Sequence, residues 1–456
     1  MKKIELYDFQ RKAVRDVKKE FKEKNKILVT SPPGSGKTVM IAELARLAVN
    51  RKEKVLIIGQ RREMLKQTYA HLLGVGAAEQ HIGEIYPNSD RSLDLSKPIQ
   101  IISAMTGLRR NLFPKADLVI MDEAHHIVAE GHARIISNYP KKDIVGFTAT
   151  PIRMDGKGLG DVFDVLLTAA YPSDLIKDKK LAKPKSFSVP DEFLPDLTRI
   201  RRAMGDYVLP QLSERVNRKK LVGSIVGEYL KRAKDKTAIC FATGLEHSKH
   251  IVNQFIAAGV PAEHLEGSMD AKERDGIVNR LREGETKVVS NVGILHEGFN
   301  LPKTYAVILA RPTLSLALYL QQVGRALRRY GNINPLILDH ARNVLRFGLP
   351  EADREFDLHN TVVVNVKQST VKKCPECFVI ISLGCKTCPE CGYEFKAEPL
   401  IPEESKKSLE ELTKTEKEKL KQRLEDYLEK KGEKDPVWIA RVIEAWTAAR
   451  SEFLNV

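Results

Sequence analysis

The chain has 456 residues, 42% of them hydrophobic, and its 75 Lys and Arg outnumber its 60 Asp and Glu, for a formal net charge of +15. This length exceeds one hydrophobic core, so two or three domains are expected, and the positive charge favours a polyanionic partner. No apolar run is long enough to cross a bilayer and none resembles a secretory signal, which excludes membrane-spanning classes and leads us to expect a cytoplasmic protein.

The first informative motif is the stretch Ser31 to Thr38, with the sequence SPPGSGKT, between an apolar run at residues 27–30 and a helical pattern. A glycine-rich turn that leads into a helix directs several backbone N–H groups and the positive end of the helix dipole at one point. Lys37 can then reach the β and γ phosphates of a nucleotide, and Thr38 can bind Mg²⁺. The strict pattern has Gly at the position of Ser31. The sequence therefore predicts a variant phosphate-binding loop with a cradle formed by Pro33, Gly34, Ser35 and Gly36.

A pair of carboxylates follows the apolar run Asp117 to Met121. Parallel sheets present their functional groups at the carboxyl ends of strands. Asp122 is expected to hold Mg²⁺, and Glu123 to polarise the water that attacks the γ-phosphate, because phosphoryl transfer needs an aligned nucleophile and neutralised charge. The sequence thus predicts hydrolysis of a nucleoside triphosphate.

Short β-rich runs alternate with helical stretches in two successive regions, which predicts an α/β fold with two tandem parallel-sheet lobes. The runs expected to be strands are 27–30, 55–59, 99–103, 118–121 and 144–148 in the first lobe and 238–242, 287–290, 306–310 and 336–339 in the second. The second lobe has no phosphate loop of its own. The expected boundaries are 1–170 for lobe 1, 171–220 for a connector, 221–345 for lobe 2 and 346–372 for a linker.

A helical stretch after Pro312 carries Gln321, Arg325 and Arg328 at positions i, i+4 and i+7. This spacing predicts that the three side chains share one helix face. The first lobe offers no obvious arginine for the charge of a phosphoryl-transfer transition state, so we expect the second lobe to supply it.

Five of the six cysteines lie between residues 374 and 391. Two CPEC repeats supply Cys374 and Cys377, then Cys388 and Cys391, a spacing typical of a four-cysteine zinc ribbon, expected at 373–396. Cys385 forms a competing CxxC pair with Cys388. The first set is preferred because the two repeats are equivalent and a glycine follows the last of them.

The region 397–456 is rich in Glu and Lys. Leucines at helical spacing, followed by Asp435-Pro436 and a second apolar stripe, predict a C-terminal helical hairpin.

Taken together, these motifs resemble the superfamily 2 helicases of the DEAD/DEAH-box type, which have two RecA-like lobes, and the resemblance covers residues 4–345. The matching segments in chain order are 6–10, 31–38, 60–64, 122–125, 148–151, 298–302 and 321–328. The resemblance implies that the protein hydrolyses ATP with Mg²⁺ while it acts on nucleic acid.

The resemblance also implies roles for individual residues. Gln10 is expected to read the adenine edge, and Gly298 and Asn300 to contact the nucleotide, although many relatives carry Asp where Asn300 stands. Gln60 and Arg61 are expected to contact the nucleic-acid backbone. The implied coupling residues are His125, Thr148 and Thr150, and the implied catalytic residues of the second lobe are Gln321 and the arginine fingers Arg325 and Arg328.

Within the superfamily, the segments 150–159, 338–341 and 347–350 are similar to phage and bacterial DNA helicases grouped with the excision-repair helicase and restriction motors. The implied partner is DNA with junctions between single and double strands. Two alternatives are a restriction or defence motor that moves on duplex DNA without separating strands, and an RNA helicase. The zinc ribbon and the hairpin are candidate contacts for a junction or a protein partner, and the ribbon alternatively serves as a structural cap on lobe 2.

Overall fold

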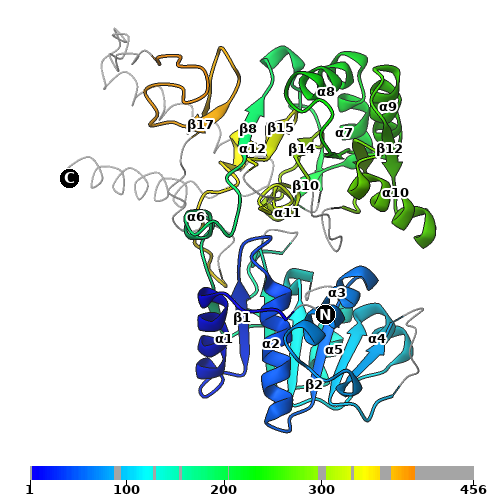
Figure 1. Ribbon diagram of the computed structural model, residues 1–456, viewed down its shortest axis with the longest axis vertical. Helices are drawn as coiled ribbons and strands as arrows, with labels where there is room; N and C mark the ends of the chain where they lie inside the picture. The colour runs from blue at the N-terminus through cyan, green and yellow to red at the C-terminus, as the bar shows by residue number, and fades with distance from the viewer. Residues whose placement is uncertain are drawn as a thin grey trace, which may run out of the picture. The chain divides into compact units, whose positions relative to one another are not determined.

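The computed structural model describes residues 3–86, 94–126, 130–153, 157–203, 205–295, 304–329, 333–359 and 371–395. They form two parallel β-sheets, each covered by helices on both faces, and a small cysteine-rich ribbon, which confirms the predicted α/β fold class (Figure 1). The expected C-terminal hairpin at 397–456 lies outside the described residues. None of the described helices combines the length and apolar character needed to span a membrane.

The first lobe is built on a seven-stranded sheet in the order β3-β4-β2-β5-β6-β1-β7, with every neighbouring pair parallel. Its strands are β1 (Lys26–Thr30), β2 (Val55–Gly59), β3 (Ile82–Ile85), β4 (Ile99–Ser103), β5 (Leu118–Asp122), β6 (Asp143–Thr148) and β7 (Val165–Thr168). Its helices are α1 (Asp8–Glu20), α2 (Lys37–Asn50), α3 (Arg62–Gly74), α4 (Ala104–Arg110) and α5 (Glu130–Ser137), with short 3₁₀ turns at Glu79–His81 and Ala124–His126.

Alternate side chains of these strands enter two separate cores, as expected for a sheet buried on both faces. Ile27 and Val29 of β1 pack with the helices α1, α2 and α3, whereas Leu28 between them packs on the opposite face with α4 and α5. The strand positions predicted from apolar runs are confirmed, and β3 and β7 are added at the two edges.

The second lobe contains a six-stranded parallel sheet in the order β12-β13-β11-β14-β15-β8. Its strands are β8 (Lys185–Ser188), β11 (Ala238–Phe241), β12 (Ala262–Leu265), β13 (Val288–Asn291), β14 (Ala306–Leu309) and β15 (Leu336–Asp339). Its helices are α7 (Leu209–Val216), α8 (Lys219–Arg232), α9 (Leu245–Ala257), α10 (Ala271–Glu283), α11 (Leu316–Val323) and α12 (Asn343–Phe347). Helices α8 and α9 cover one face, and α10 and α11 cover the other.

The expected connector, 171–220, contributes to the second lobe. Its strand β8 pairs in parallel with β15 at the edge of the sheet. The rest of the segment contains α6 (Pro172–Lys177), a 3₁₀ turn (Asp191–Phe193), a two-stranded hairpin of β9 (Arg202–Ala203) and β10 (Asp206–Tyr207), and α7.

The cysteine-rich ribbon, β16 (Val371–Lys373) and β17 (Ile380–Ser382), packs on the edge strand β8. Val379 bridges to Phe187 of β8, and the Phe378 carbonyl accepts a hydrogen bond from Ser188 N at 2.9 Å. Arg232 of α8 lies over the Phe187 ring at 3.9 Å and donates to the Cys377 carbonyl at 2.8 Å. The ribbon therefore shares a hydrophobic core with the second lobe.

Residues 349–359, which we call the strap, follow the second lobe and return to the first. Leu358 is buried in the core of lobe 1 beside Leu159, and its carbonyl accepts a hydrogen bond from Gly160 N at 2.8 Å. Asp353 accepts a hydrogen bond from Ser173 N at the start of α6. A Cβ atom at Gly158 would lie 2.0 Å from the Leu358 carbonyl oxygen, so the strap can lie here only because position 158 has no side chain.

We expect Gly158→Ala to displace the strap, since the clash is with backbone that cannot rotate away. Exposing Leu358 costs about 1.5–3 kcal/mol, so the thermal unfolding midpoint should fall by several degrees. The matched control is Gly223→Ala in α8, where a Cβ atom meets nothing within 4 Å and alanine favours the helix. An unchanged midpoint in Gly158→Ala would show that the strap does not stabilise lobe 1.

Candidate nucleotide site and cysteine cluster

The predicted phosphate loop lies between β1 and α2, and its conformation depends on two glycines. Gly34 and Gly36 have φ angles of +82° and +85°, in the left-handed region that glycine adopts without strain. A Cβ atom at Gly36 would lie 2.5 Å from Gln10 Nε2. Lys37 and Thr38 then begin α2, whose N-terminus carries unpaired N–H groups suited to an anion.

Side chains on either side of the loop hold it in place. Ser31 Oγ donates to Ser35 Oγ at 2.7 Å. The serine that replaces the usual glycine therefore forms a hydrogen bond across the loop, from its first residue to its fifth. Gln10 Nε2 donates to the Ser35 carbonyl at 2.8 Å, and Gln10 Oε1 accepts from Tyr7 N at 2.9 Å. The structure thus places Gln10 against the loop, and its reading of adenine stays a prediction. The Ser31 contact was not foreseen, because a serine in a turn has many equivalent interpretations.

The predicted carboxylates lie where β5 ends. Asp122 is buried and its Oδ1 accepts from Glu123 N at 3.0 Å. Glu123 has a φ angle of +50°, a conformation that costs energy for a residue with a side chain and recurs at functional sites. Its Oε1 lies 3.9 Å from Lys37 Nζ, with only 17% of the Glu123 side chain exposed. The loop lysine and the second carboxylate are therefore brought together as expected.

His125 lies at the centre of a buried hydrogen-bonded chain. Gln321 Nε2 lies 2.9 Å from His125 Nε2, and because an amide nitrogen can only donate, this ring nitrogen must be the acceptor. The ring proton is then on Nδ1, which lies 3.0 Å from Thr148 Oγ1 and 3.4 Å from Glu123 Oε2. Thr148 Oγ1 in turn donates to the Thr150 carbonyl and accepts from Thr150 N. The expected coupling residues are thus in direct contact with one another and with Glu123.

The backbone of the predicted arginine motif is helical only as far as Val323, whereas a continuous helix was expected. Helix α11 ends at Val323, and Arg328 lies in a β-bridge with Leu181, so the prediction that Gln321, Arg325 and Arg328 share one helix face is wrong. Gly324 follows the last residue of the helix and packs closely on lobe 1. A Cβ atom there would lie 2.3 Å from Pro33 Cβ, so this close approach requires glycine.

The turn after the helix nevertheless buries Arg325 and places Arg328, which is half-buried, against the phosphate loop. Arg325 is 7% exposed. A Cβ atom at Gly34 would lie 3.1 Å from Arg328 Cγ, so the Arg328 stem packs on the phosphate loop, and burial lowers the pKa of its guanidinium.

Arg61 also contacts the second lobe. It donates to the carbonyls of Ile294 and Gly293 at 3.1 and 3.2 Å. Asn291 shapes this loop, since its Oδ1 accepts from Leu295 N at 3.1 Å. Sequence reasoning missed this role of Asn291, although a polar residue at the end of a buried strand is the available signal. The roles of Gln60 and Arg61 on nucleic acid stay predictions, and Gly298 and Asn300 lie outside the described residues.

Four cysteines converge at the tip of the ribbon. The Sγ atoms of Cys374, Cys377, Cys388 and Cys391 all lie within 4.8 Å of one another, and Cys385 is not part of this group. The Cys374–Cys391 and Cys377–Cys388 sulfur distances are 3.6 and 3.7 Å. A tetrahedral zinc ion with Zn–S bonds of about 2.3 Å requires sulfurs about 3.8 Å apart, so the donor set and spacing fit zinc.

Comparison with known protein families gives matches in both lobes. The family described as type III restriction enzyme, res subunit, matches residues 3–153, and the helicase conserved C-terminal domain matches residues 220–330.

Individual relatives extend over more of the chain. A 51.5 kDa protein of a Lactococcus phage is 31% identical over 401 residues, which cover 86% of this chain and 83% of that protein. IRC3 of Saccharomyces cerevisiae is 30% identical over 353 residues, and the match spans 71% of this chain but only about half, 49%, of IRC3. The ATP-dependent type ISP restriction-modification enzyme LlaBIII, solved bound to DNA, has a similar fold, with a TM-score of 0.53 and 18% identity over 74% of this chain and 28% of that enzyme.

Proposed function

Because this chain belongs to the superfamily 2 helicases of the restriction-motor and repair type, we propose that it is a Mg²⁺-dependent, nucleic-acid-stimulated ATPase that moves along or remodels DNA, acting on forks or branched duplexes. The observation that carries the proposal is the buried chain from Glu123 through His125 to Gln321. It joins the expected catalytic carboxylate of lobe 1 to a helix of lobe 2, so a change at the nucleotide can alter the contact between the lobes.

In the proposed hydrolysis of ATP, each site residue of lobe 1 has a separate role. The backbone N–H groups of the loop and Lys37 bind the ATP phosphates. Thr38 and Asp122 would hold Mg²⁺, which would supply charge neutralisation at the phosphates. Glu123 orients the attacking water and accepts its proton, and the strained backbone fixes the direction of this carboxylate.

The second lobe completes the proposed site. Arg325 and Arg328 neutralise charge that develops on the transferred phosphoryl group. The burial of Arg325 and the packing of the Arg328 stem on the phosphate loop support this role, because electrostatic interactions are stronger where water is excluded. Hydrolysis breaks the bond between the β- and γ-phosphates, and departure of the free phosphate removes the negative charge that these arginines bind. The contact between the lobes then weakens, and nucleic acid lying across both would be shifted along its backbone.

A second candidate function is translocation on duplex DNA without strand separation. It is favoured by the match of lobe 1 to a restriction-enzyme subunit and by the fold likeness to LlaBIII. The two functions share the ATP site and differ in the nucleic acid that stimulates it.

The function is tested by measuring ATP turnover in parallel with single-stranded DNA, duplex DNA, forked DNA and RNA. We expect the largest stimulation with forked DNA. Greatest stimulation by plain duplex would favour the duplex motor, and greatest stimulation by RNA would favour an RNA helicase. Glu123→Gln is the control, because it keeps the phosphate loop and should bind ATP while turnover is lost. Nucleic-acid independence of the wild-type protein would overturn the proposal.

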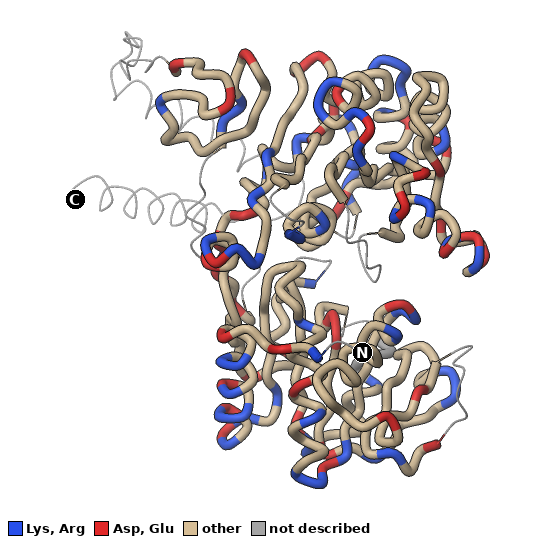
Figure 2. The backbone as a smooth tube through the Cα atoms, viewed as in Figure 1, with Lys and Arg blue, Asp and Glu red and all other residues tan. Residues whose placement is uncertain are grey.

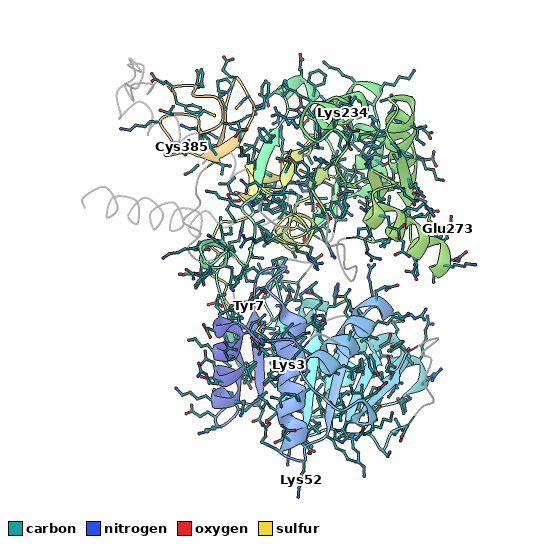
Figure 3. The ribbon with its side chains drawn as sticks, in the orientation of Figure 1. Lys3, Tyr7, Lys52, Lys234, Glu273 and Cys385 are labelled. Carbon is teal, nitrogen blue, oxygen red and sulfur yellow. The ribbon has the colours of Figure 1, made fainter. Side chains whose placement is uncertain are left out.

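We also propose that the four clustered cysteines bind one zinc ion as thiolates. The core of lobe 2 includes Cys374, Cys388, Val379 and Ile381 of the ribbon. This packing favours a role for the ribbon as a structural cap on lobe 2 over a role as a contact for nucleic acid or a protein partner. Contact with a junction or a protein partner would then involve the exposed part of the ribbon. Cys385, labelled in Figure 3, is half-buried and packs against the same core.

We expect metal analysis of the purified protein to give about one zinc per chain, since four thiolates close one tetrahedral site. Cys377→Ser should lose the metal, whereas Cys385→Ser, the matched control outside the cluster, should retain it. Loss of zinc in Cys385→Ser together with retention in Cys377→Ser would show that the ligand set is wrong.

A further inference from the structure

An exposed basic hairpin follows β8 at the start of the second lobe and has no role in the functions assigned above. This basic hairpin, residues 199–203 and 205–207, contains β9, β10 and three arginines: Arg199, Arg201 and Arg202. All three are exposed, and within the described part of the chain neither Arg201 nor Arg202 forms an ion pair with a carboxylate. Lys and Arg are otherwise spread over both lobes (Figure 2).

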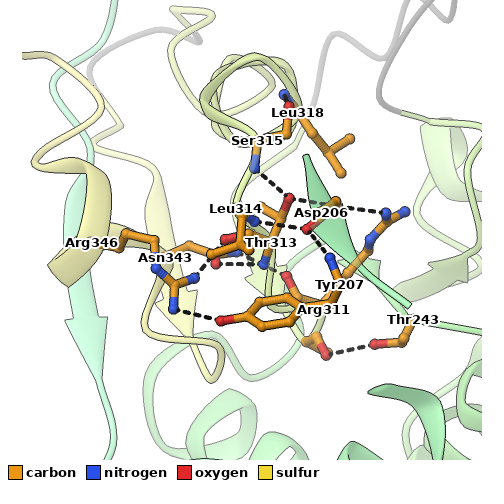
Figure 4. Close-up of polar contacts among 11 residues, drawn as sticks. Asp206, Tyr207, Thr243, Arg311, Thr313, Leu314, Ser315, Leu318, Asn343 and Arg346 are labelled. Carbon is orange, nitrogen blue, oxygen red and sulfur yellow. Dashed lines mark hydrogen bonds and ion pairs between the residues drawn. The ribbon is translucent and has the colours of Figure 1, made fainter. Parts of the chain in front are cut away.

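The basic hairpin is anchored by one carboxylate, Asp206 (Figure 4). Its Oδ2 accepts from Thr313 Oγ1 at 2.9 Å and from Arg311 Nη2 at 3.2 Å, and its Oδ1 accepts from Leu314 N at 2.8 Å. Only 16% of the Asp206 side chain is exposed. Charge-assisted hydrogen bonds in such a place hold the short strands firmly, although a two-stranded hairpin is marginal by itself.

A cavity beside the basic hairpin is lined by further arginines and an aromatic ring. Arg202, Tyr207, Arg342 and Arg346 line it, together with Asp191 and Asp196. Arg346 is held by the Tyr207 hydroxyl at 3.1 Å, and Arg342 pairs with Asp191 at 3.5 Å. Arginines and a ring at one surface are the groups that contact phosphates and sugars of a nucleic acid.

Hydrogen bonds also connect Asp206, the anchor of the basic hairpin, with the helix that contacts the candidate nucleotide site. Thr313 Oγ1, which donates to Asp206, accepts from Ser315 N at 3.0 Å. Ser315 caps α11, because its Oγ accepts from Leu318 N at 3.3 Å. The same helix carries Gln321, which donates to His125. A displacement of the basic hairpin would therefore move the start of the helix whose end contacts the expected catalytic residues.

We propose that the basic hairpin binds the phosphate backbone of the nucleic acid, and that Asp206 transmits this contact to α11 and so to ATP turnover. The inference rests on the proposed function. A loop that merely carried solvated charges would need neither the buried anchor nor the link to the helix cap.

Binding is tested with fluorescently labelled forked DNA over a series of salt concentrations. Arg201→Ala/Arg202→Ala should weaken binding and make the slope of log K against log salt shallower by about 2, because two phosphate contacts are lost. The matched control is Lys234→Ala/Lys236→Ala, which removes two exposed positive charges from the same lobe after α8 (Figure 3). Its slope should equal that of the wild type. Equal slopes in all three proteins would overturn the phosphate contact.

Transmission is tested with Asp206→Asn at saturating DNA. We expect its ratio of DNA-stimulated to basal turnover to fall several-fold while its DNA affinity and thermal unfolding midpoint stay close to the wild-type values. A merely structural role would lower the midpoint and the affinity together, and an unchanged ratio would equally overturn the transmission. If DNA stimulates neither the wild type nor the lysine control, the proposed function itself fails, which is distinct from a failure confined to the hairpin variants.

Discussion

The hydrogen bond between Gln321 and His125 is the interaction on which the rest of the site depends. Because the amide donates to Nε2, the histidine must keep its proton on Nδ1, where Thr148 and Glu123 lie. One bond from the second lobe therefore sets the tautomer of a buried ring in the first, whose Nδ1 contacts Thr148 and lies 3.4 Å from Glu123 Oε2. Buried polar chains of this kind are costly when one member is unsatisfied, so loss of either Gln321 or His125 should weaken the contact between the lobes.

Other contacts converge on the same boundary between the lobes. The strap buries Leu358 in the core of lobe 1, Gly324 packs on Pro33 of the phosphate loop, and Arg61 bonds to the loop after β13. Each holds lobe 2 against lobe 1 without taking part in the proposed chemistry. The basic hairpin adds the proposed input from nucleic acid, since the hydrogen bonds of its anchor, Asp206, lead to the cap of the helix that carries Gln321.

The sequence predicts the parts of this arrangement that are local. SPPGSGKT and the carboxylates after β5 could be recognised because a strand, a turn and a helix follow one another within a few residues. The end of α11 at Val323 could not, because Arg328 forms a bridge with Leu181, a residue far away in the sequence. Likewise the strap pairs Gly158 with Leu358. A strand near Phe187 is expected from the sequence of the connector, but its pairing with β15 at the edge of the second sheet is not. Contacts between distant residues leave no periodic signal.

The most direct test of this account is a double-mutant cycle on nucleic-acid-stimulated ATP turnover with Gln321→Ala and His125→Ala. If the two side chains act through their shared hydrogen bond, Gln321→Ala should lower turnover in the wild-type background but change it by about twofold or less in the His125→Ala background. The same fold loss in both backgrounds would show that the two residues act independently, and would contradict the coupling of the lobes through His125.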